Sequence, residues 1–332
     1  MISKREQEIL KVIVEEYIKT AKPISSNSIC KKLKCSSATI RNEMVYLEEL
    51  GYLEKNHFAS GRIPSEEGYK YYVDNLMTPR DMNGEDMLKL QTIFHNQTLD
   101  LSDTIKKSIE IISEITNYTS VVLGNSSKNN KLKKVEIVPL EDNKILTMVI
   151  TDKGYVEHKN LYLPATISIE EVRKTVDLIN KLIVGTPIDE VSEKLEYEVK
   201  PIIGKYVVQH EVLYNAFYDA FSEFTSKAND VTFMGRNNFL KQPEFNSVEK
   251  ISKLLNKFDD VSSITTEEGN GVNIYVGKDS EISDDVSIIK TNYNYNGEEG
   301  TIAIIGPKRM EYGRVVSMLD YIKNNIGGND EK

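Results

Sequence analysis

Six residues near the N-terminus carry the kinds of side chain that read the bases of DNA. They are Ser36, Ser37, Ala38, Thr39, Arg41 and Asn42. Hydroxyl, amide and guanidinium groups form hydrogen bonds with base edges in the major groove, and a methyl group packs against the methyl of thymine. Their grouping in one short stretch predicts a surface that recognises double-stranded DNA by sequence.

Two helices are expected to hold these side chains in place. Ser25 can cap the first helix, and the second begins at Ser36 or Ser37. The apolar side chains of the second helix recur every three or four residues, at Ile40, Met44, Leu47 and Leu50. Such spacing places them on one face that must be buried. The opposite face then presents the base-reading residues, which is the arrangement of a helix-turn-helix.

A β-hairpin is predicted directly after these helices. Residues 53–57 form one strand, the chain returns through Ile63, and Ser60-Gly61 lies at the tip. An amphipathic helix over residues 3–20 would close the core beneath the motif. Together these elements predict a winged helix. Arg62 is then a wing residue close to the DNA backbone or to the minor groove.

The local charge fits a polyanionic partner. Residues 19–42 contain six Lys or Arg and no Asp or Glu, and Lys31, Lys32 and Lys34 are expected to contact phosphates. The net charge of the chain is −9, but residues 1–80 have 13 basic and 11 acidic side chains, a net of +2. The acidity therefore lies outside the predicted reading surface. Charge and periodicity alone leave open an ordinary helical subdomain with solvated lysines.

Enzymatic chemistry is not predicted. The sequence has neither a phosphate-binding Gly-x-x-x-x-Gly-Lys-Ser/Thr loop nor a Gly-x-Ser-x-Gly nucleophile motif, and its four histidines are scattered. Cys30 and Cys35 are too few for a zinc site and are expected to be small buried residues in a reducing cytoplasm. No cofactor or metal is expected. With no apolar signal and no membrane-spanning stretch, the chain is expected to be soluble and cytoplasmic.

The remaining chain alternates between helical and sheet patterns. Residues 77–84 are rich in Pro, Gly and Asn and mark a boundary, after which helices follow to about residue 118. Three short strands over residues 135–161 predict an antiparallel meander. A helical block at 166–229 separates it from further strands, so we expect one sheet domain interrupted by an insertion. The meander is compatible with either part.

One predicted helix, from about residue 204 to 226, is unusually aromatic. It carries six of the 18 Tyr and 9 Phe side chains of the whole chain. So wide an apolar face belongs either in a core or at an interface between subunits. A symmetric operator requires two DNA-binding heads, which favours the interface. The predicted dimer contacts are Tyr206, Leu213, Phe217, Phe221 and Phe224.

Two sequence blocks resemble the heat-inducible transcription repressor family HrcA. The first contains Ser-Ser-Ala-Thr-Ile-Arg-Asn-Glu-Met and Leu-Glu-Glu-Leu-Gly-Tyr-Leu within residues 36–53. The second is Ser-Gly-Arg-Ile-Pro-Ser-Glu-Glu-Gly-Tyr-Lys-Tyr-Tyr-Val-Asp at 60–74, and both stand in the order and spacing of the family. The resemblance implies a homodimeric repressor of chaperone operons that binds the inverted-repeat CIRCE operator and is kept active by the GroE chaperonin.

The resemblance also implies an α+β fold. Residues 1–76 form a winged-helix DNA-binding domain, and 77–100 form a linker with a connecting helix. A GAF-like antiparallel sheet domain, 101–165 and 230–328, is interrupted by a mostly helical dimerising insertion at 166–229. GAF-like folds often bind small molecules, so a winged-helix repressor controlled by a metabolite is the alternative. A weaker one is an RNA-associated or structural protein whose winged helix contacts other proteins.

Overall fold

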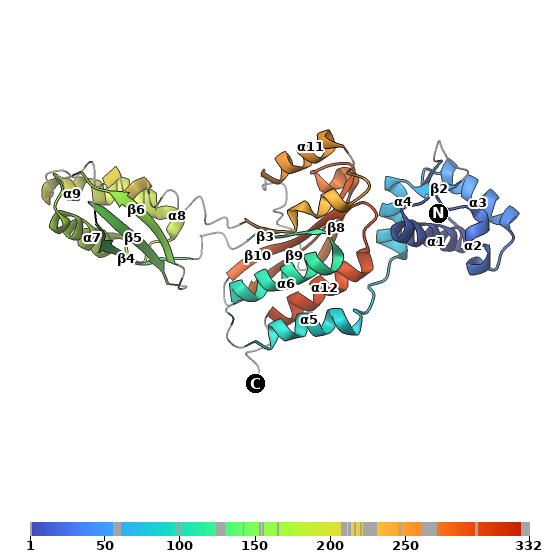
Figure 1. Ribbon diagram of the computed structural model, residues 1–332, viewed down its shortest axis with the longest axis horizontal. Coiled ribbons are helices and arrows are strands. Elements are labelled where there is room, and N and C mark those ends of the chain that lie inside the picture. Colours follow the sequence, from blue (N-terminus) through green and yellow to red (C-terminus); the bar gives the residue numbers. More distant parts are fainter. Residues whose placement is uncertain are drawn as a thin grey trace. The chain divides into compact units, whose positions relative to one another are not determined.

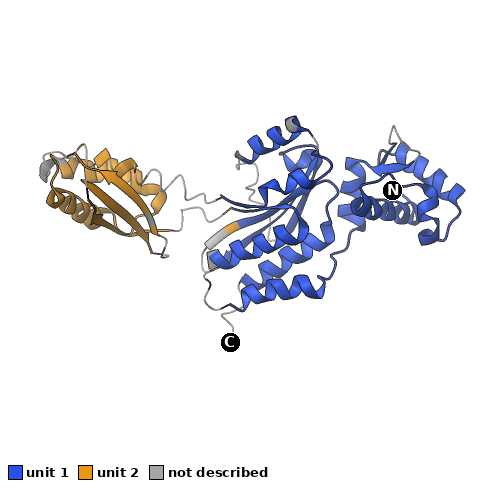
Figure 2. Cartoon of the chain, viewed as in Figure 1, with its two compact units in different colours: residues 1–122, 231–295, 301–332 blue, residues 123–230, 296–300 orange. Residues whose placement is uncertain are grey.

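The chain folds into two compact units (Figure 2). Unit 1 comprises residues 1–122, 231–295 and 301–332, and unit 2 comprises residues 123–230 and 296–300. The structure is a computed structural model that describes residues 2–55, 61–96, 99, 101–123, 130–141, 143–152, 154, 156–164, 166–206, 211, 214–215, 217–219, 221, 231–245, 247–259, 271–295 and 298–326.

The N-terminal head of unit 1 is a winged helix. Its elements are α1 (Lys4–Thr20), α2 (Ser26–Leu33), α3 (Ser37–Glu49), β1 (Leu53–Lys55), β2 (Arg62–Pro64), α4 (Glu66–Tyr71) and the π-helical turn η1 (Tyr72–Leu76). Strands β1 and β2 pair antiparallel, from Leu53 opposite Pro64 to Lys55 opposite Arg62. The predicted wing is thereby confirmed, while Ser60 at its predicted tip lies outside the described residues.

Serine caps determine where the helices of the motif begin. The Ser25 hydroxyl accepts from the backbone N–H of Ser28, and the Ser36 hydroxyl accepts from that of Thr39. These bonds satisfy N–H groups that a first helical turn leaves free. The buried faces of α1, α2 and α3 then form one core of Ile9, Leu10, Ile13, Val14, Ile29, Ile40, Met44 and Leu47. Leu50, expected on this face, is 44% exposed because α3 ends before it.

The sheet domain of unit 1 has five strands in the order β7-β3-β10-β9-β8 (Figure 1). Its elements are α5 (Gly84–Phe94), α6 (Leu101–Thr116), β3 (Thr119–Leu123), β7 (Val231–Met234), the 3-10 helix η4 (Arg236–Lys241), α11 (Val248–Asp259), β8 (Val272–Val276), the 3-10 turn η6 (Gly277–Ser280), β9 (Val286–Tyr295), β10 (Glu298–Pro307) and α12 (Tyr312–Ile326). Helices α5, α6 and α12 lie on one side of the sheet and α11 lies on the other. Strands β3 and β7 are adjacent in the sheet, and residues 124–230 of unit 2 lie between them in the sequence, so this segment is an insertion.

Unit 2 combines a three-stranded sheet with helices. Its elements are β4 (Leu132–Pro139), β5 (Lys144–Thr151), β6 (Val156–Tyr162), α7 (Ile169–Ile183), α8 (Ile188–Lys194), the π-helical turn η3 (Leu195–Val199) and α9 (Lys200–Tyr206). The strands form the predicted antiparallel meander in the order β4-β5-β6. Ser168 is the N-cap of α7 and forms a capping box with Glu171.

The meander belongs to the insertion, which corrects the predicted border at residue 166. Val135 and Val149 of the sheet share one buried core with Val176 of α7. The Asn180 side chain of α7 also bonds the backbone of Val135 in both directions, accepting at 2.8 Å and donating at 2.9 Å. Helix and sheet therefore fold together. The insertion begins near residue 123 and contains the meander as well as the helices, which is one of the two placements that the sequence left open.

Candidate DNA-binding surface

The buried face of α3 fixes the rotation of this helix in the head. Ile40 and Leu47 are fully buried. With this face in the core, Ala38, Arg41 and Asn42 are exposed on the first two turns. The N-terminal turns of a recognition helix are the part that contacts base edges in the major groove. We call Ala38, Arg41 and Asn42 the reading edge.

The predicted serine and threonine hydroxyls are engaged within the head. The Ser36 hydroxyl caps α3 and lies 2.8 Å from the Thr39 hydroxyl. The Ser37 hydroxyl, in a half-buried residue, lies 2.9 Å from that of Ser26 in α2. These contacts join the two helices of the motif and set the start of α3. Ser36, Ser37 and Thr39 therefore help to position the reading edge.

Arg41 is the cation of the reading edge. Of the three arginines of the head, Arg5 and Arg62 pair with glutamates, whereas Arg41 has no carboxylate partner in the part of the chain that the structure describes. Arg41 lines a hollow together with polar residues of α2 and the wing. An unpaired guanidinium can form two parallel hydrogen bonds to guanine or hold a phosphate.

Four polar residues of this hollow were not predicted from the sequence as candidate DNA contacts. Ser25, Ser26 and Asn27 come from the start of α2, and Lys55 comes from the end of β1. The free N–H groups and the dipole of a helix start favour a phosphate nearby. The absence of acidic residues from the first turn of α2 was a usable signal. The place of Lys55 beside α2 depends on the tertiary fold, which no local pattern indicates.

The three predicted phosphate-contacting lysines are exposed but differ in their surroundings. Lys32 forms an ion pair with Glu16 of α1, and its hydrogen bond lowers the pKa of Glu16. Lys31 and Lys34 have no carboxylate partner among the described residues. The charges of Lys31 and Lys34 are therefore available to phosphates, while that of Lys32 is partly neutralised.

Replacing Lys31 should weaken binding to all DNA sequences alike. We expect Lys31→Ala to reduce the slope of log affinity against log salt concentration by about one. Lys32→Ala should change the slope less, because Glu16 already neutralises part of its charge. Titrations of operator and random duplexes at several salt concentrations measure both effects. A loss confined to the operator, or a larger slope change for Lys32→Ala, would contradict these assignments.

Arg62, predicted to lie close to the DNA backbone or the minor groove, forms an ion pair within the head. Its Nε and Nη2 lie 2.7 Å and 2.6 Å from one carboxylate oxygen of Glu48 in α3, and its side chain is 14% exposed. Its backbone N–H and C=O exchange hydrogen bonds with Ile24 at 2.9 Å and 2.8 Å. Arg62 therefore fastens the wing to α3 and to the segment before α2, at the edge of the hollow.

Loss of this fastening should destabilise the head. We expect Arg62→Ala to lower the free energy of unfolding by about 1–2 kcal/mol, because Glu48 would keep a partly buried carboxylate without its partner. Lys55→Ala, an exposed change on the other wing strand, should leave stability within about 0.5 kcal/mol. Urea unfolding of the full chain measures both. Equal stabilities of the two variants would contradict the structural role of Arg62.

The predicted dimer contacts that the structure describes lie in the hydrophobic core of unit 2. Phe217 and Phe221 are 0% and 1% exposed and belong to the core of unit 2. Their assignment to a subunit interface was therefore wrong, because their surfaces are already covered within one chain. The Tyr206 side chain, Leu213 and Phe224 lie outside the described residues.

No group of three His, Cys, Asp or Glu side chains that would hold a metal occurs among the described residues. Cys30 and Cys35 are half-buried free thiols that pack against the head core. In the same part of the chain, no helix combines the length and apolar character needed to cross a membrane.

Comparisons with known proteins also indicate a DNA-binding domain at residues 1–72. Residues 1–72 match the family described as "Winged helix-turn-helix transcription repressor, HrcA DNA-binding", and residues 102–316 match "HrcA protein C terminal domain". The chain is 36% identical to the heat-inducible transcription repressor HrcA of Bacillus pumilus (strain SAFR-032) and 35% identical to that of Lysinibacillus sphaericus. Each match covers 98% of this chain and 97% of the relative.

The whole fold also has a counterpart among solved structures. The crystal structure of a hypothetical protein matches this chain with a TM-score of 0.69 at 20% sequence identity. The match covers 99% of this chain and 98% of the other. It supports the α+β architecture of a winged helix joined to sheet-containing domains.

Proposed function

The chain belongs to the HrcA family of heat-inducible transcription repressors, and we propose that it represses chaperone operons by binding an inverted-repeat operator of the CIRCE type. The reading edge of α3 enters the major groove of each half-site, where Arg41 contacts a guanine or an anchoring phosphate. The observation that carries this proposal is the exposure of the reading edge on a helix whose opposite face is fully buried.

Competition for a labelled operator duplex tests sequence-specific duplex binding. We expect unlabelled operator to compete at concentrations about 10³ lower than a scrambled duplex of equal length. An RNA hairpin of the same sequence should compete no better than the scrambled duplex, because its major groove is too narrow for a helix. Equal competition by all three would contradict the proposal.

An inverted-repeat operator requires two heads, and the insertion offers a surface for pairing two chains. The register of the meander places Val138, Val156 and Tyr162 on the sheet face opposite its buried core. Their side chains are 41%, 52% and 74% exposed. Exposed apolar side chains gathered on one face are typical of an interaction surface. This supports a homodimer held together through the insertions of two chains.

Placing a charge on this face should dissociate the dimer. We expect Val156→Lys to raise the dimer dissociation constant at least about tenfold, because an interface core tolerates an unpaired charge poorly. Val184→Lys is the matched control, since Val184 is 47% exposed at the end of α7. Sedimentation velocity over a range of concentrations measures the constant. A dimer unaffected by Val156→Lys would contradict the use of this face.

The GroE chaperonin is proposed to keep the repressor active. A marginal interface between chains exposes apolar surface on heating, and such surface is what a chaperonin captures. Unfolded proteins then compete with the repressor for the chaperonin. The repressor loses activity, and the operon is no longer repressed. The active fraction of repressor after mild heating, measured by operator titration with and without chaperonin, tests this step. Equal active fractions would contradict it.

A further inference from the structure

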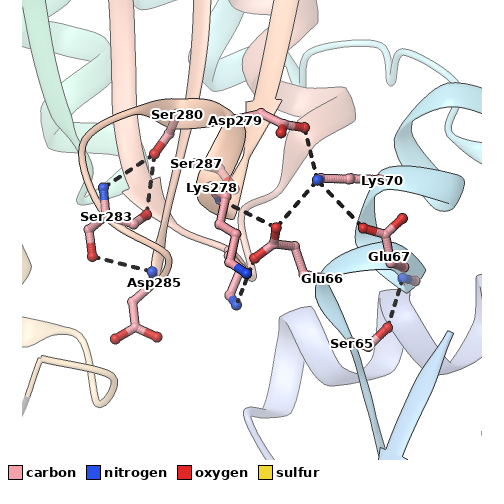
Figure 3. A network of polar contacts seen from close by, with 12 residues as sticks. Ser65, Glu66, Glu67, Lys70, Lys278, Asp279, Ser280, Ser283, Asp285 and Ser287 are labelled. Carbon is pink, nitrogen blue, oxygen red and sulfur yellow. Dashed lines mark hydrogen bonds and ion pairs between the residues drawn. The ribbon is translucent and has the colours of Figure 1, made fainter. Parts of the chain in front are cut away.

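Helix α4 of the head meets the edge of the sheet domain through charged side chains (Figure 3). The Lys70 ammonium lies 3.0 Å from a carboxylate oxygen of Asp279 in η6 and 3.3 Å from one of Glu66. The hydrogen bond to Asp279 raises the pKa of Lys70, so this side chain remains charged. We call Glu66, Lys70, Lys278, Asp279 and Lys308 the α4 junction.

Glu66 reaches across the junction from the head. The backbone N–H of Lys278 lies 3.4 Å from a Glu66 carboxylate oxygen, and the Lys308 ammonium lies 3.8 Å from the other. The neighbouring Gly277 makes this approach possible, because a Cβ there would lie only 2.2 Å from the carboxylate. The Glu66 side chain thus occupies the space that a side chain at residue 277 would need, and the two surfaces fit each other.

Apolar packing and the linker reinforce these polar contacts. Tyr69 of α4 is buried, and its ring centroid lies 6.3 Å from that of Tyr312 in α12. The backbone N–H of Arg80 in the linker donates to the carbonyl of Gly313 at 3.1 Å. One hydrophobic cluster continues from the head core into the sheet domain. Contacts of three kinds therefore join the head to the sheet domain.

The reading edge of α3 and the α4 junction share no residue. A change in the junction therefore leaves the contacts of one head with one half-site intact. A dimer, however, must fit both half-sites at once, and their centres lie about 34–36 Å apart for each helical turn of DNA. Inserting two base pairs rotates one half-site by roughly 70° relative to the other, at about 10 base pairs per turn. Heads of fixed orientation must deform the DNA to follow that rotation.

We propose that the α4 junction makes the repressor selective for the spacing between operator half-sites, with Glu66, Lys70 and Asp279 as positioning residues. The inference rests on the two-headed binding proposed above. A head locked to the sheet domain transmits the geometry of the dimer to its reading edge. A released head swings on the linker and accepts half-sites at other distances and rotations.

The test measures the affinity of the full chain for operators whose central spacer is unchanged, shortened by two base pairs or lengthened by two. In the Asp279→Lys variant a cation replaces the carboxylate beside Lys70, so the two sides of the junction repel each other. We expect the preference for the native spacer to fall by about threefold to tenfold, the range that a few exposed ion pairs can supply. Binding to a duplex with a single half-site should not change.

Two further variants separate release of the junction from general damage. Glu249→Lys is the matched control, because Glu249 pairs at 2.7 Å with Lys253 within α11, outside the α4 junction, and should keep the native spacer preference. The double variant Lys70→Glu with Asp279→Lys exchanges the two charges and should restore part of that preference. Thermal unfolding of each variant verifies that the chain is folded.

Three results would overturn the inference. An unchanged spacer preference in Asp279→Lys would show that the junction does not set spacing. Equal gains in affinity at every spacer length would make the junction a general inhibitory contact instead. If the unaltered chain binds the inverted repeat no more tightly than a single half-site, two-headed binding itself fails, and this result is distinct from the other two.

Discussion

Arg41→Ala is expected to weaken operator binding by about 1–3 kcal/mol per half-site, the range for loss of a good base contact. Arg41 is exposed on α3 and has no carboxylate partner among the described residues, so its removal takes nothing from the head core. Stability should therefore stay within about 0.5 kcal/mol of the unaltered chain. Titration of operator and random duplexes, together with urea unfolding, measures both quantities.

The matched control for Arg41 is another exposed arginine of the head. The Arg5 side chain is 59% exposed in α1 and lies 3.8 Å from Glu43. Arg5→Ala removes the same charge outside the reading edge, so discrimination between operator and random duplex should persist. If Arg41→Ala also keeps full discrimination, or if Arg5→Ala loses as much, Arg41 is not a base contact.

Phe217→Ala should cost about 3–5 kcal/mol of unfolding free energy, the usual price of truncating a fully buried phenylalanine. Phe217 is 0% exposed and lies in the core shared by the meander and its helices. The loss should be localised in unit 2, where hydrogen exchange of amides in β5 and α7 will accelerate. It should also be independent of protein concentration, because the contact lies within one chain.

Tyr197→Ala provides the comparison within the same unit. Tyr197 is 72% exposed in η3, so its truncation should change stability by less than about 1 kcal/mol. A destabilisation of Phe217→Ala that vanished at high protein concentration would restore the interface interpretation. Equal effects of the two substitutions would contradict the burial of Phe217.

The features of the head that depend on neighbouring residues were predictable from sequence. Ser25 and Ser36 bond backbone N–H groups within one turn, and Ile40, Met44 and Leu47 recur with the helical period. Such signals act over three or four residues, so a sequence displays them directly. The exposure of Arg41 follows from the same periodicity, since the core face of α3 leaves it only the outward side.

What could not be predicted depends on contacts between distant residues. Arg62 stands 14 residues after Glu48, and only the folded wing brings the two charges together. Whether the meander belongs to the sheet domain or the insertion depends on the packing of Val135 and Val149 against α7. The aromatic side chains pose the same problem, because a core and an interface both bury apolar surface and select the same residue types. The alternation that predicts strands could be recognised in the sequence, but the helix that packs against those strands could not.

The proposed repressor places the reading edge of α3 in the major groove of both operator half-sites. Dimethyl sulfate protection is a direct test of this placement, because the reagent methylates guanine N7, which faces that groove. With the unaltered full chain we expect protected guanines at symmetric positions in the two half-sites, and with Arg41→Ala we expect one guanine in each half-site to regain reactivity. Guanine reactivity that is unchanged on binding, or protection in one half-site alone, would contradict the claim.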